Sequence, residues 1–217
     1  MLGLPKSTEF NKRIPKQKFY KNMDTPMKIK KMFVDQVKTI YWKNKIAEST
    51  MNLVKGENVM EIEIFEVRLN SQLQDDSLLR QIDRQIPYHI LFLLEYQNKY
   101  QAWIGYKEAS VSGKAAFKVN NYYHTDWVTK DNLLLEIQGL NMDDAYENYV
   151  RQIAGNKLQS KEAGESLKIS VERDEQKQIL QKRIEVLKNK IRKEKQLNKQ
   201  MEMNTEIKKL KRKLEEL

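Results

Sequence analysis

The sequence predicts an α+β fold in which a mainly antiparallel mixed sheet with packed helices is followed by a C-terminal helical tail, either a coiled coil or a helical hairpin. Two observations predict it. Segments of alternating apolar and polar residues, typical of strands, occur among amphipathic helical segments over residues 27–155. Residues 171–217 contain no Gly or Pro and are dominated by Lys, Glu, Gln and Leu, which is typical of long paired helices.

The chain is expected to divide into four parts. Residues 1–26 show no clear hydrophobic period and are expected to form an extended basic arm that lies on the body. The α+β body covers residues 27–155. A polar linker over residues 156–170, which contains Gly164, then leads into the helical tail of residues 171–217.

The first helix of the body is expected to run from Thr25 to about Asn44. Thr25 fits an N-cap and Pro26 fits the first helical position. Apolar residues then recur every three or four positions, which predicts an amphipathic helix.

Residues 59–69 predict the first strand. Met60, Ile62 and Ile64 alternate with glutamates, and the apolar phase then shifts by one residue at Phe65. Such a shift indicates either a β-bulge or a strand that is buried on both sides over part of its length.

A second helix and a hairpin follow. Asp75–Ser77 forms a cap for a short helix that Pro87 ends. The continuous apolar run of residues 89–96 predicts a central strand. Residues 97–99 then form a turn into an alternating strand over residues 100–106.

The rest of the body gives weaker strand signals and one clear helix. Residues 117–123, Trp127 and residues 133–137 predict two or three further strands. Residues 142–153 have helical spacing, with Asn141 in a capping position and a glycine–asparagine pair at the end.

The tail contains two stretches of apolar residues at the spacing of a coiled-coil seam, and their registers differ by 16 residues, which is not a multiple of seven. Either one helix continues through a stutter, or the chain reverses near Asn204–Thr205 into a helical hairpin. In both cases the tail is expected to pair with itself or with a protein partner. The predicted interface residues are Leu180, Ile184, Leu187, Ile191, Ile207, Leu210, Leu214 and Leu217.

The net charge of +10 is concentrated at the two ends of the chain. Residues 1–31 carry nine Lys or Arg and two Asp or Glu, residues 171–217 carry fifteen and nine, and residues 32–170 carry 16 and 19. This asymmetry makes DNA or RNA a candidate partner, although basic extensions also simply keep proteins in solution. The candidate nucleic-acid contacts are Lys6, Lys12, Arg13, Lys16, Lys18, Arg192, Lys193 and Lys195.

Composition excludes several classes of function. Because the chain has no cysteine, it forms no disulfide, thiolate nucleophile or cysteine-ligated zinc site. No long apolar run or signal-peptide pattern is present, so we expect no membrane span and a cytoplasmic location. No glycine-rich phosphate loop occurs, and we expect no cofactor, no metal site and no catalytic residue.

A metal-dependent nuclease is the enzymatic alternative, because such enzymes place acidic residues and a lysine on adjacent strands. An acid followed two residues later by lysine is absent from these strands, and alternating glutamates on a strand usually form a solvated face. The candidate residues are Glu61, Glu63, Glu66, Asp75, Asp76, Glu95 and either Lys99 or Lys107.

Two further groups have both a functional and a structural interpretation. His124 and Asp126 lie two residues apart and could form a base with its orienting carboxylate, but a structural histidine on the sheet face is favoured. Aromatic residues near lysines could stack on unpaired bases, but we favour a role in the core. That aromatic set is Tyr100, Trp103, Tyr106, Tyr122, Tyr123 and Trp127, with Lys99, Lys107 and Lys118.

Three segments carry a family resemblance: LPKST of Leu4–Thr8 with IPK of Ile14–Lys16, IPYHILFLLEY of Ile86–Tyr96 with the hairpin behind it, and the close of the tail from Ile191. Over nearly the full chain they resemble the bacterial "domain of unknown function 4391" family. The resemblance implies a setting beside helicase and DNA-methyltransferase genes in restriction-like defence loci, and therefore a helicase or a DNA methyltransferase as partner. It implies no activity and no catalytic residues.

Taken together, these features predict a non-catalytic interaction or accessory protein of a bacterial DNA-processing or phage-defence complex, with the tail as its assembly element. The alternatives are a metal-dependent nuclease-like domain and a nucleic-acid-binding module.

Overall fold

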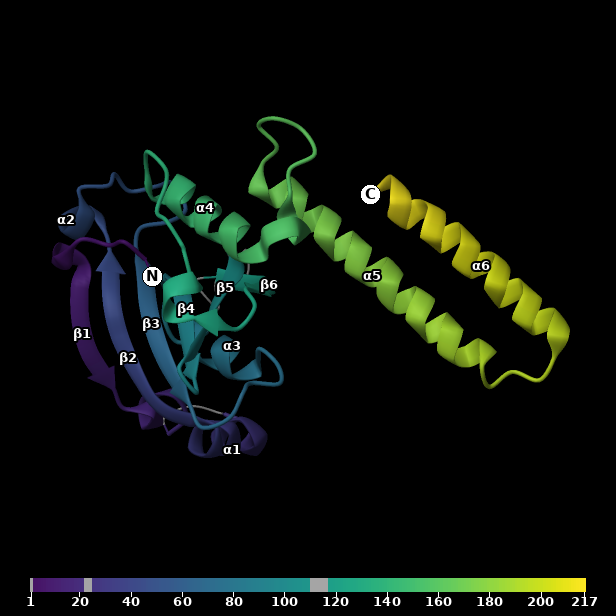
Figure 1. The fold of residues 1–217 in the computed structure, drawn as a ribbon, viewed down its shortest axis with the longest axis horizontal. Helices are drawn as coiled ribbons and strands as arrows, with labels where there is room; N and C mark the ends of the chain where they lie inside the picture. Colours follow the sequence, from purple (N-terminus) through teal and green to yellow (C-terminus); the bar gives the residue numbers. More distant parts are fainter. Residues whose placement is uncertain (1, 22–24, 110–116) are drawn as a thin grey trace. The chain divides into compact units, whose positions relative to one another are not determined.

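The computed structural model describes residues 2–21, 25–109 and 117–217, and it divides into two compact units, residues 1–155 and 156–217. The first unit is an α+β structure on a mixed sheet whose described strands lie in the order β1-β2-β3-β4-β5-β6, with β7 paired to β5 (Figure 1). The strands are β1 (Glu9–Ile14), β2 (Val37–Ile46), β3 (Ile62–Leu69), β4 (His89–Tyr96), β5 (Lys99–Ala109), β6 (Phe117–His124) and β7 (Val128–Thr129).

Four α-helices and three short 3-10 turns accompany the sheet in the described part of the first unit, and a further 3-10 turn begins at its last residue. The α-helices are α1 (Met27–Asp35), α2 (Glu48–Met51), α3 (Ser77–Asp83) and α4 (Met142–Ala154). The 3-10 turns are η1 (Lys6–Thr8), η2 (Lys16–Phe19), η3 (Lys130–Asn132) and η4 (Gly155–Leu158).

Helices cover both faces of the sheet. On one face, Phe65 of β3 belongs to a buried cluster that also contains Phe33 of α1 and Ile82 of α3. His89 belongs to the other face, because it is the register partner of Ile62, and its ring lies 4.3 Å from that of Tyr146 on α4. The predicted α+β class, with a mixed sheet and packed helices, is therefore confirmed.

The centre of the sheet is the parallel pair β3 and β4, joined through α3, while the other paired strands are antiparallel. Both central strands are buried on both faces, since seven of the eight residues of β3 and six of the eight residues of β4 are buried. The phase shift at Phe65 therefore reflects two-sided burial. The register of the pairing between β3 and the neighbouring strand β2 shifts at two places, between Val37 and Thr39 and between Trp42 and Asn44.

The prediction of one helix from Thr25 to Asn44 is wrong in its second half. Helix α1 ends at Asp35, and residues 37–46 form β2 between β1 and β3. This segment is rich in β-branched and aromatic residues, which favour a half-buried pleated strand over a helix. Residues 9–14, expected within an extended arm, form the antiparallel edge strand β1.

The predicted strand at residues 133–137 is also wrong. Leu133 and Leu135 are buried in alternation, but this segment is extended without belonging to a strand. The side chain of Gln152 on α4 accepts a hydrogen bond from the N–H of Glu136 at 3.0 Å and donates one to its carbonyl at 2.6 Å. A side chain therefore takes the place of a neighbouring strand.

The second unit is a helical hairpin of α5 (Leu167–Ile191) and α6 (Leu197–Glu216). The chain reverses at residues 192–196, and the predicted reversal at Asn204–Thr205 is wrong because both residues lie inside α6. The side chain of Glu194 stabilises this turn, because its carboxylate accepts hydrogen bonds from the N–H groups of Lys195 at 2.8 Å and Gln196 at 2.9 Å. These bonds satisfy donors at the beginning of α6.

The loop before β3 depends on one carboxylate. Asp143 of α4 accepts backbone hydrogen bonds from Glu57 at 2.8 Å and Val59 at 2.7 Å, and also from the N–H of Asn58. We expect Asp143→Ala to lower the free energy of unfolding by about 2–3 kcal/mol, because three donors lose a charged acceptor. Urea denaturation measures this change. The control Asp144→Ala removes a carboxylate that accepts only from Leu140 among the described backbone groups, so an equal loss there would contradict the prediction.

Candidate functional site

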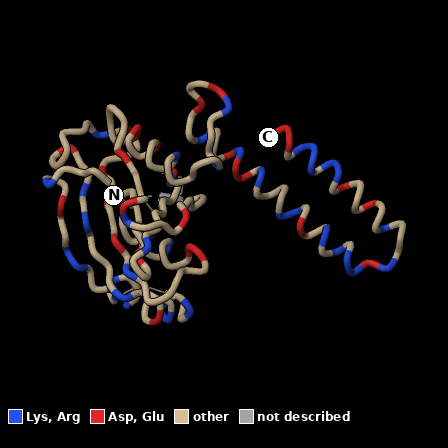
Figure 2. Tube along the Cα trace, viewed as in Figure 1, with Lys and Arg blue, Asp and Glu red and all other residues tan. Residues whose placement is uncertain are grey.

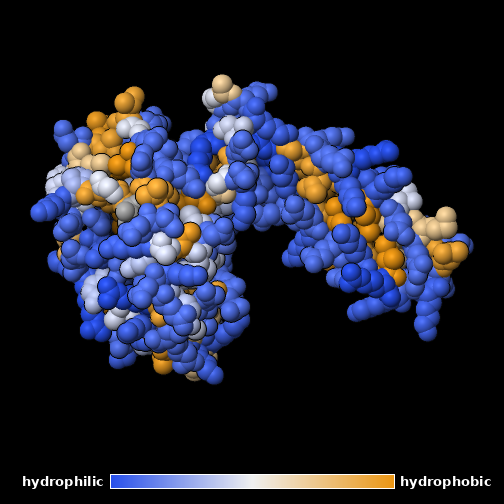
Figure 3. All heavy atoms as spheres, viewed as in Figure 1, coloured by the Kyte–Doolittle hydropathy of each residue, from blue (hydrophilic) through white to orange (hydrophobic). Residues whose placement is uncertain are grey.

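The seam between α5 and α6 contains the predicted interface residues. Ile184, Leu187 and Ile207 are buried in one cluster. Partly buried residues extend this cluster along both helices: Ile191, Met203, Leu210 and Leu214. Leu180 and Leu217 lie at the other end of the hairpin, where they line a groove. The two helices thus bury the middle of the seam and leave its margins partly open, as the apolar strip in Figure 3 shows.

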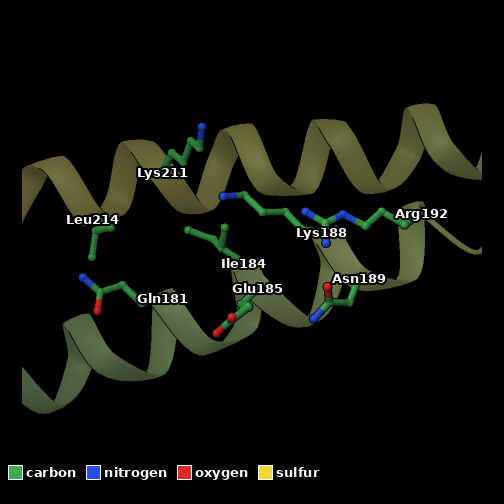
Figure 4. Close-up of a pocket in the computed structure, with 8 residues that line it drawn as sticks. All are labelled: Gln181, Ile184, Glu185, Lys188, Asn189, Arg192, Lys211 and Leu214. Atoms are coloured by element: carbon green, nitrogen blue, oxygen red, sulfur yellow. The ribbon is translucent and has the colours of Figure 1, made fainter.

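Two grooves follow this seam. We call the first the basic groove; its volume is about 450 Å³, and Figure 4 shows its side chains along α5 and α6. It is lined by Gln181, Ile184, Glu185, Lys188, Asn189, Arg192, Lys211 and Leu214. The second, the apolar groove, has a volume of about 420 Å³. It is lined by Gln176, Ile179, Leu180, Lys213, Glu216 and Leu217.

Large apolar side chains also lie outside the seam. Ile179 is 67% exposed and Val186 is 41% exposed, and their seven-residue spacing places them on one side of α5. On α6, Leu197 is 69% exposed and Met201 is 61% exposed. An isolated two-helix hairpin leaves these residues in water.

Charged residues of both signs, with an excess of basic ones, lie along the two helices. Residues 156–217 carry 18 Lys or Arg and 11 Asp or Glu, and Figure 2 shows both signs along the two helices. Arg183 of α5 and Glu206 of α6 form an ion pair across the hairpin at 3.0 Å. Both side chains are about half exposed, so this pair contributes less than about 1 kcal/mol.

The candidate nucleic-acid contacts lie in two different units. Lys6 lies in η1, Lys12 and Arg13 in β1, and Lys16 and Lys18 in η2. Arg192, Lys193 and Lys195 lie at the exposed turn of the hairpin.

Two of these N-terminal lysines already have contacts within the sheet unit. Lys16 donates to the carbonyls of Val34 at 3.1 Å and Val37 at 2.6 Å, between α1 and β2. Lys12 lies 4.2 Å from the ring centroid of Phe10. Hydrogen bonds of Lys16 therefore link η2 to α1 and to the start of β2.

The acids of the nuclease hypothesis do not converge on one site: Glu61 lies beside Glu63, and Glu66 and Glu95 both lie near Arg68. Glu63 shares a face of β3 with Phe65, whereas Glu66 points to the opposite face and pairs with Arg68 at 2.8 Å. Several others have partners close in sequence: Asp75 accepts from Ser77, Asp76 pairs with Arg80 and Glu95 accepts from Asn98. Among the described residues, no group of three His, Asp or Glu side chains is placed to hold a metal ion.

The aromatic set mostly belongs to the packing of the sheet. Tyr106 and Tyr123 are buried, and Trp103, Tyr122 and Trp127 pack against the cluster that contains Phe65. Tyr100 is half-buried, and Lys118 has a side chain outside the described residues.

His124 is held by the sheet and not by Asp126. Its ring stacks on Trp103 at 4.4 Å, and its Nδ1 lies 3.1 Å from Nε2 of Gln101. Asp126 is exposed. In the described residues, this arrangement supports the structural role that the sequence favours for His124.

Sequence reasoning missed a buried ion pair. Lys107 Nζ of β5 lies 2.7 Å from Asp83 Oδ1 of α3, and both side chains are almost fully buried. The same ammonium donates to the carbonyl of Tyr88 at 2.5 Å, and the hydroxyl of Tyr122 donates to Asp83. Burial raises the pKa of Asp83, and the Lys107 ammonium opposes that rise. Burial, helped by Lys107, lowers the pKa of His89 to about 3.

Glu63 is a second buried acid, although the sequence pattern predicted a solvated face for the alternating glutamates. It is 1% exposed, and its carboxylate oxygens have no hydrogen bond to any described residue. Its side chain lies beside a pocket of about 300 Å³ that also contains Trp42, Phe65 and Tyr88. Burial raises the pKa of Glu63 to about 7; the nearby Trp42 and Lys45 side chains oppose that rise, and the neighbouring Glu61 carboxylate adds to it.

The family model "Domain of unknown function (DUF4391)" matches residues 2–214. The chain belongs to the DUF4391 family. This match covers both the sheet unit and the hairpin of the DUF4391 chain, in agreement with the resemblance found in the sequence. No curated protein and no solved structure matches it. Its described helices include none with the length and apolar character that a bilayer crossing requires.

The buried pair predicts a strong asymmetry between single and double replacements. Lys107→Met should lower the free energy of unfolding by about 3–5 kcal/mol, because Asp83 then stays buried without its cation. Lys107→Met combined with Asp83→Asn should recover most of that loss in urea denaturation. The surface-pair control Lys55→Met should cost about 1 kcal/mol or less, because the side chains of Lys55 and Glu48 are both more than half exposed. A double variant as unstable as Lys107→Met would contradict this account.

Glu63 predicts a pH-dependent stability. Its pKa is about 7 in the folded chain against 4.5 for the free side chain, so the folded state loses stability as pH rises from about 4.5 through about 7. Glu63→Gln should raise the free energy of unfolding by about 3 kcal/mol at pH 8 and change it little at pH 4. Urea midpoints at the two pH values measure this. Glu48→Gln is the control, since Glu48 is more than half exposed beside Lys55; the same pH dependence there would exclude the assignment to Glu63.

Proposed function

We propose that this member of the DUF4391 family is a non-catalytic interaction or accessory protein and that its helical hairpin is the assembly element. The single observation that carries the proposal is the apolar surface that the hairpin leaves open. Ile179, Leu197 and Met201 are each more than half exposed, and the margins of the seam are only partly covered. Large exposed apolar side chains beside the partly open seam of paired helices are typical of an interface.

The proposal includes a setting, a bacterial DNA-processing or phage-defence complex of the restriction-like kind, in the cytoplasm. Its support is the family resemblance, which implies a helicase or a DNA methyltransferase as the partner. The hairpin suits such a role because a helix can lie along its grooves and extend the two-helix layer into a bundle.

The two other functions have weaker support. A nuclease needs acids that converge, and Glu63 and Glu66 lie on opposite faces of β3. A nucleic-acid module needs a continuous basic surface, and Lys16 already binds two backbone carbonyls. The exposed Arg192, Lys193 and Lys195 support a contact with phosphates at the turn, as an addition to the protein interface.

The proposed interface predicts the effect of one exposed replacement. Ile179→Lys should leave the hairpin helical but weaken capture of the native partner at least about tenfold, because a charge replaces an apolar contact in the apolar groove. Capture from the host with the full chain, followed by cross-linking from the hairpin to identify the bound segment, measures this. Circular dichroism checks the helices.

The matched control is Gln178→Lys, the neighbouring exposed position, where a lysine can still pair with Asp174. It should bind as the native chain does. Equal capture by the native chain and Ile179→Lys, or equal loss in both variants, would refute an interface in the apolar groove.

A further inference from the structure

The basic groove is lined by apolar side chains between its two helices and by mainly basic side chains along its edge. Ile184 of α5 and Leu214 of α6 provide apolar contact between the helices. Lys188, Arg192 and Lys211 line the groove, against one acid, Glu185 (Figure 4). The surface therefore combines an apolar stripe with a net positive edge.

The spacing of these residues favours an elongated occupant. Ile184, Lys188 and Arg192 are four residues apart, so they follow one another along a single face of α5 over about 12 Å. Lys211 approaches the same groove from the antiparallel helix. A helix that lies along the hairpin would contact all of them, whereas a compact small molecule would not.

Charge decides between two kinds of occupant. The hairpin unit carries 18 Lys or Arg against 11 Asp or Glu, so a second copy would bring two basic surfaces together. A helix with acidic residues beside an apolar stripe would instead oppose each cation with a carboxylate, which gives both attraction and orientation.

We propose that the basic groove binds an acidic amphipathic helix of a different protein. The apolar residues of that helix lie on Ile184 and Leu214, and its carboxylates lie beside Lys188, Arg192 and Lys211. The inference rests on the proposed function, because it names the class of partner that the hairpin assembles with.

A pair of designed peptides tests this proposal on the full chain. Each peptide has three heptads with Leu at positions a and d; one carries Glu and the other Lys at positions e and g. Fluorescence anisotropy should show binding of the Glu peptide that weakens as NaCl rises from about 0.05 M to about 0.3 M, and no binding of the Lys peptide. Sedimentation of the chain alone should show a monomer.

Matched double variants separate the groove from general attraction between a basic protein and an acidic peptide. Lys188→Glu with Lys211→Glu should weaken binding of the Glu peptide at least about tenfold. Lys190→Glu with Lys209→Glu changes the net charge equally at positions that do not line the groove, and should weaken binding much less. Equal weakening in both, binding of the Lys peptide, or a dimer that the groove variant abolishes would overturn the proposal.

The host-capture experiment separates failure of the proposed function from failure of this inference. If no protein from the host cross-links to the hairpin, the proposed function fails. If a protein does cross-link but its segment is not an acidic amphipathic helix, this inference alone fails.

Discussion

The ion pair between Asp83 and Lys107 is the constraint on which the sheet unit depends. It joins the end of α3 to β5 inside the core, and Tyr122 of β6 donates to the same carboxylate. Since α3 is the crossover between the parallel strands β3 and β4, fixing its end also fixes how the chain enters β4. Replacing a buried pair by apolar residues of similar shape is often neutral or stabilising, so we infer that this pair serves mainly to specify one arrangement of these elements.

The same ammonium positions the wall of the Glu63 pocket. Lys107 binds Asp83 and the carbonyl of Tyr88, and the residues between these two positions include Ile86 and Pro87, which line the pocket. The unit thus contains two buried acids with different surroundings. Asp83 has a cation, a tyrosine hydroxyl and a defined role, whereas burial raises the pKa of Glu63 to about 7 and no described residue donates to its oxygens.

The sequence was sufficient to predict those elements that a local pattern of residues determines. The apolar run of β4, the turn at residues 97–98 and the Asn141 cap of α4 all appeared as expected, and Asn141 accepts from the N–H of Asp144 at 3.0 Å. The segment 37–46 was predicted to be helical because Val37 and Ile40 continue the apolar spacing of the preceding helix, whereas these residues form a strand. Asp83 and Lys107 are 24 residues apart, and the tertiary packing of α3 and β5 brings them together. The hairpin turn depends on side-chain bonds of Glu194, which leave no trace in the hydrophobic period.

A structure of two helices cannot bury every side chain that its helices carry. Two helices share one contact line, so side chains that point about 100° away from it stay in water whatever their chemistry. Ile179 and Val186 occupy such positions on α5, and polar residues there would favour an isolated hairpin. Their apolar character together with a positive edge on the basic groove fits a surface that is covered in an assembly, while the excess of lysine and arginine disfavours pairing between copies of this chain. The exposed apolar side chains and the positive edge of the basic groove therefore indicate the same partner, an acidic amphipathic helix.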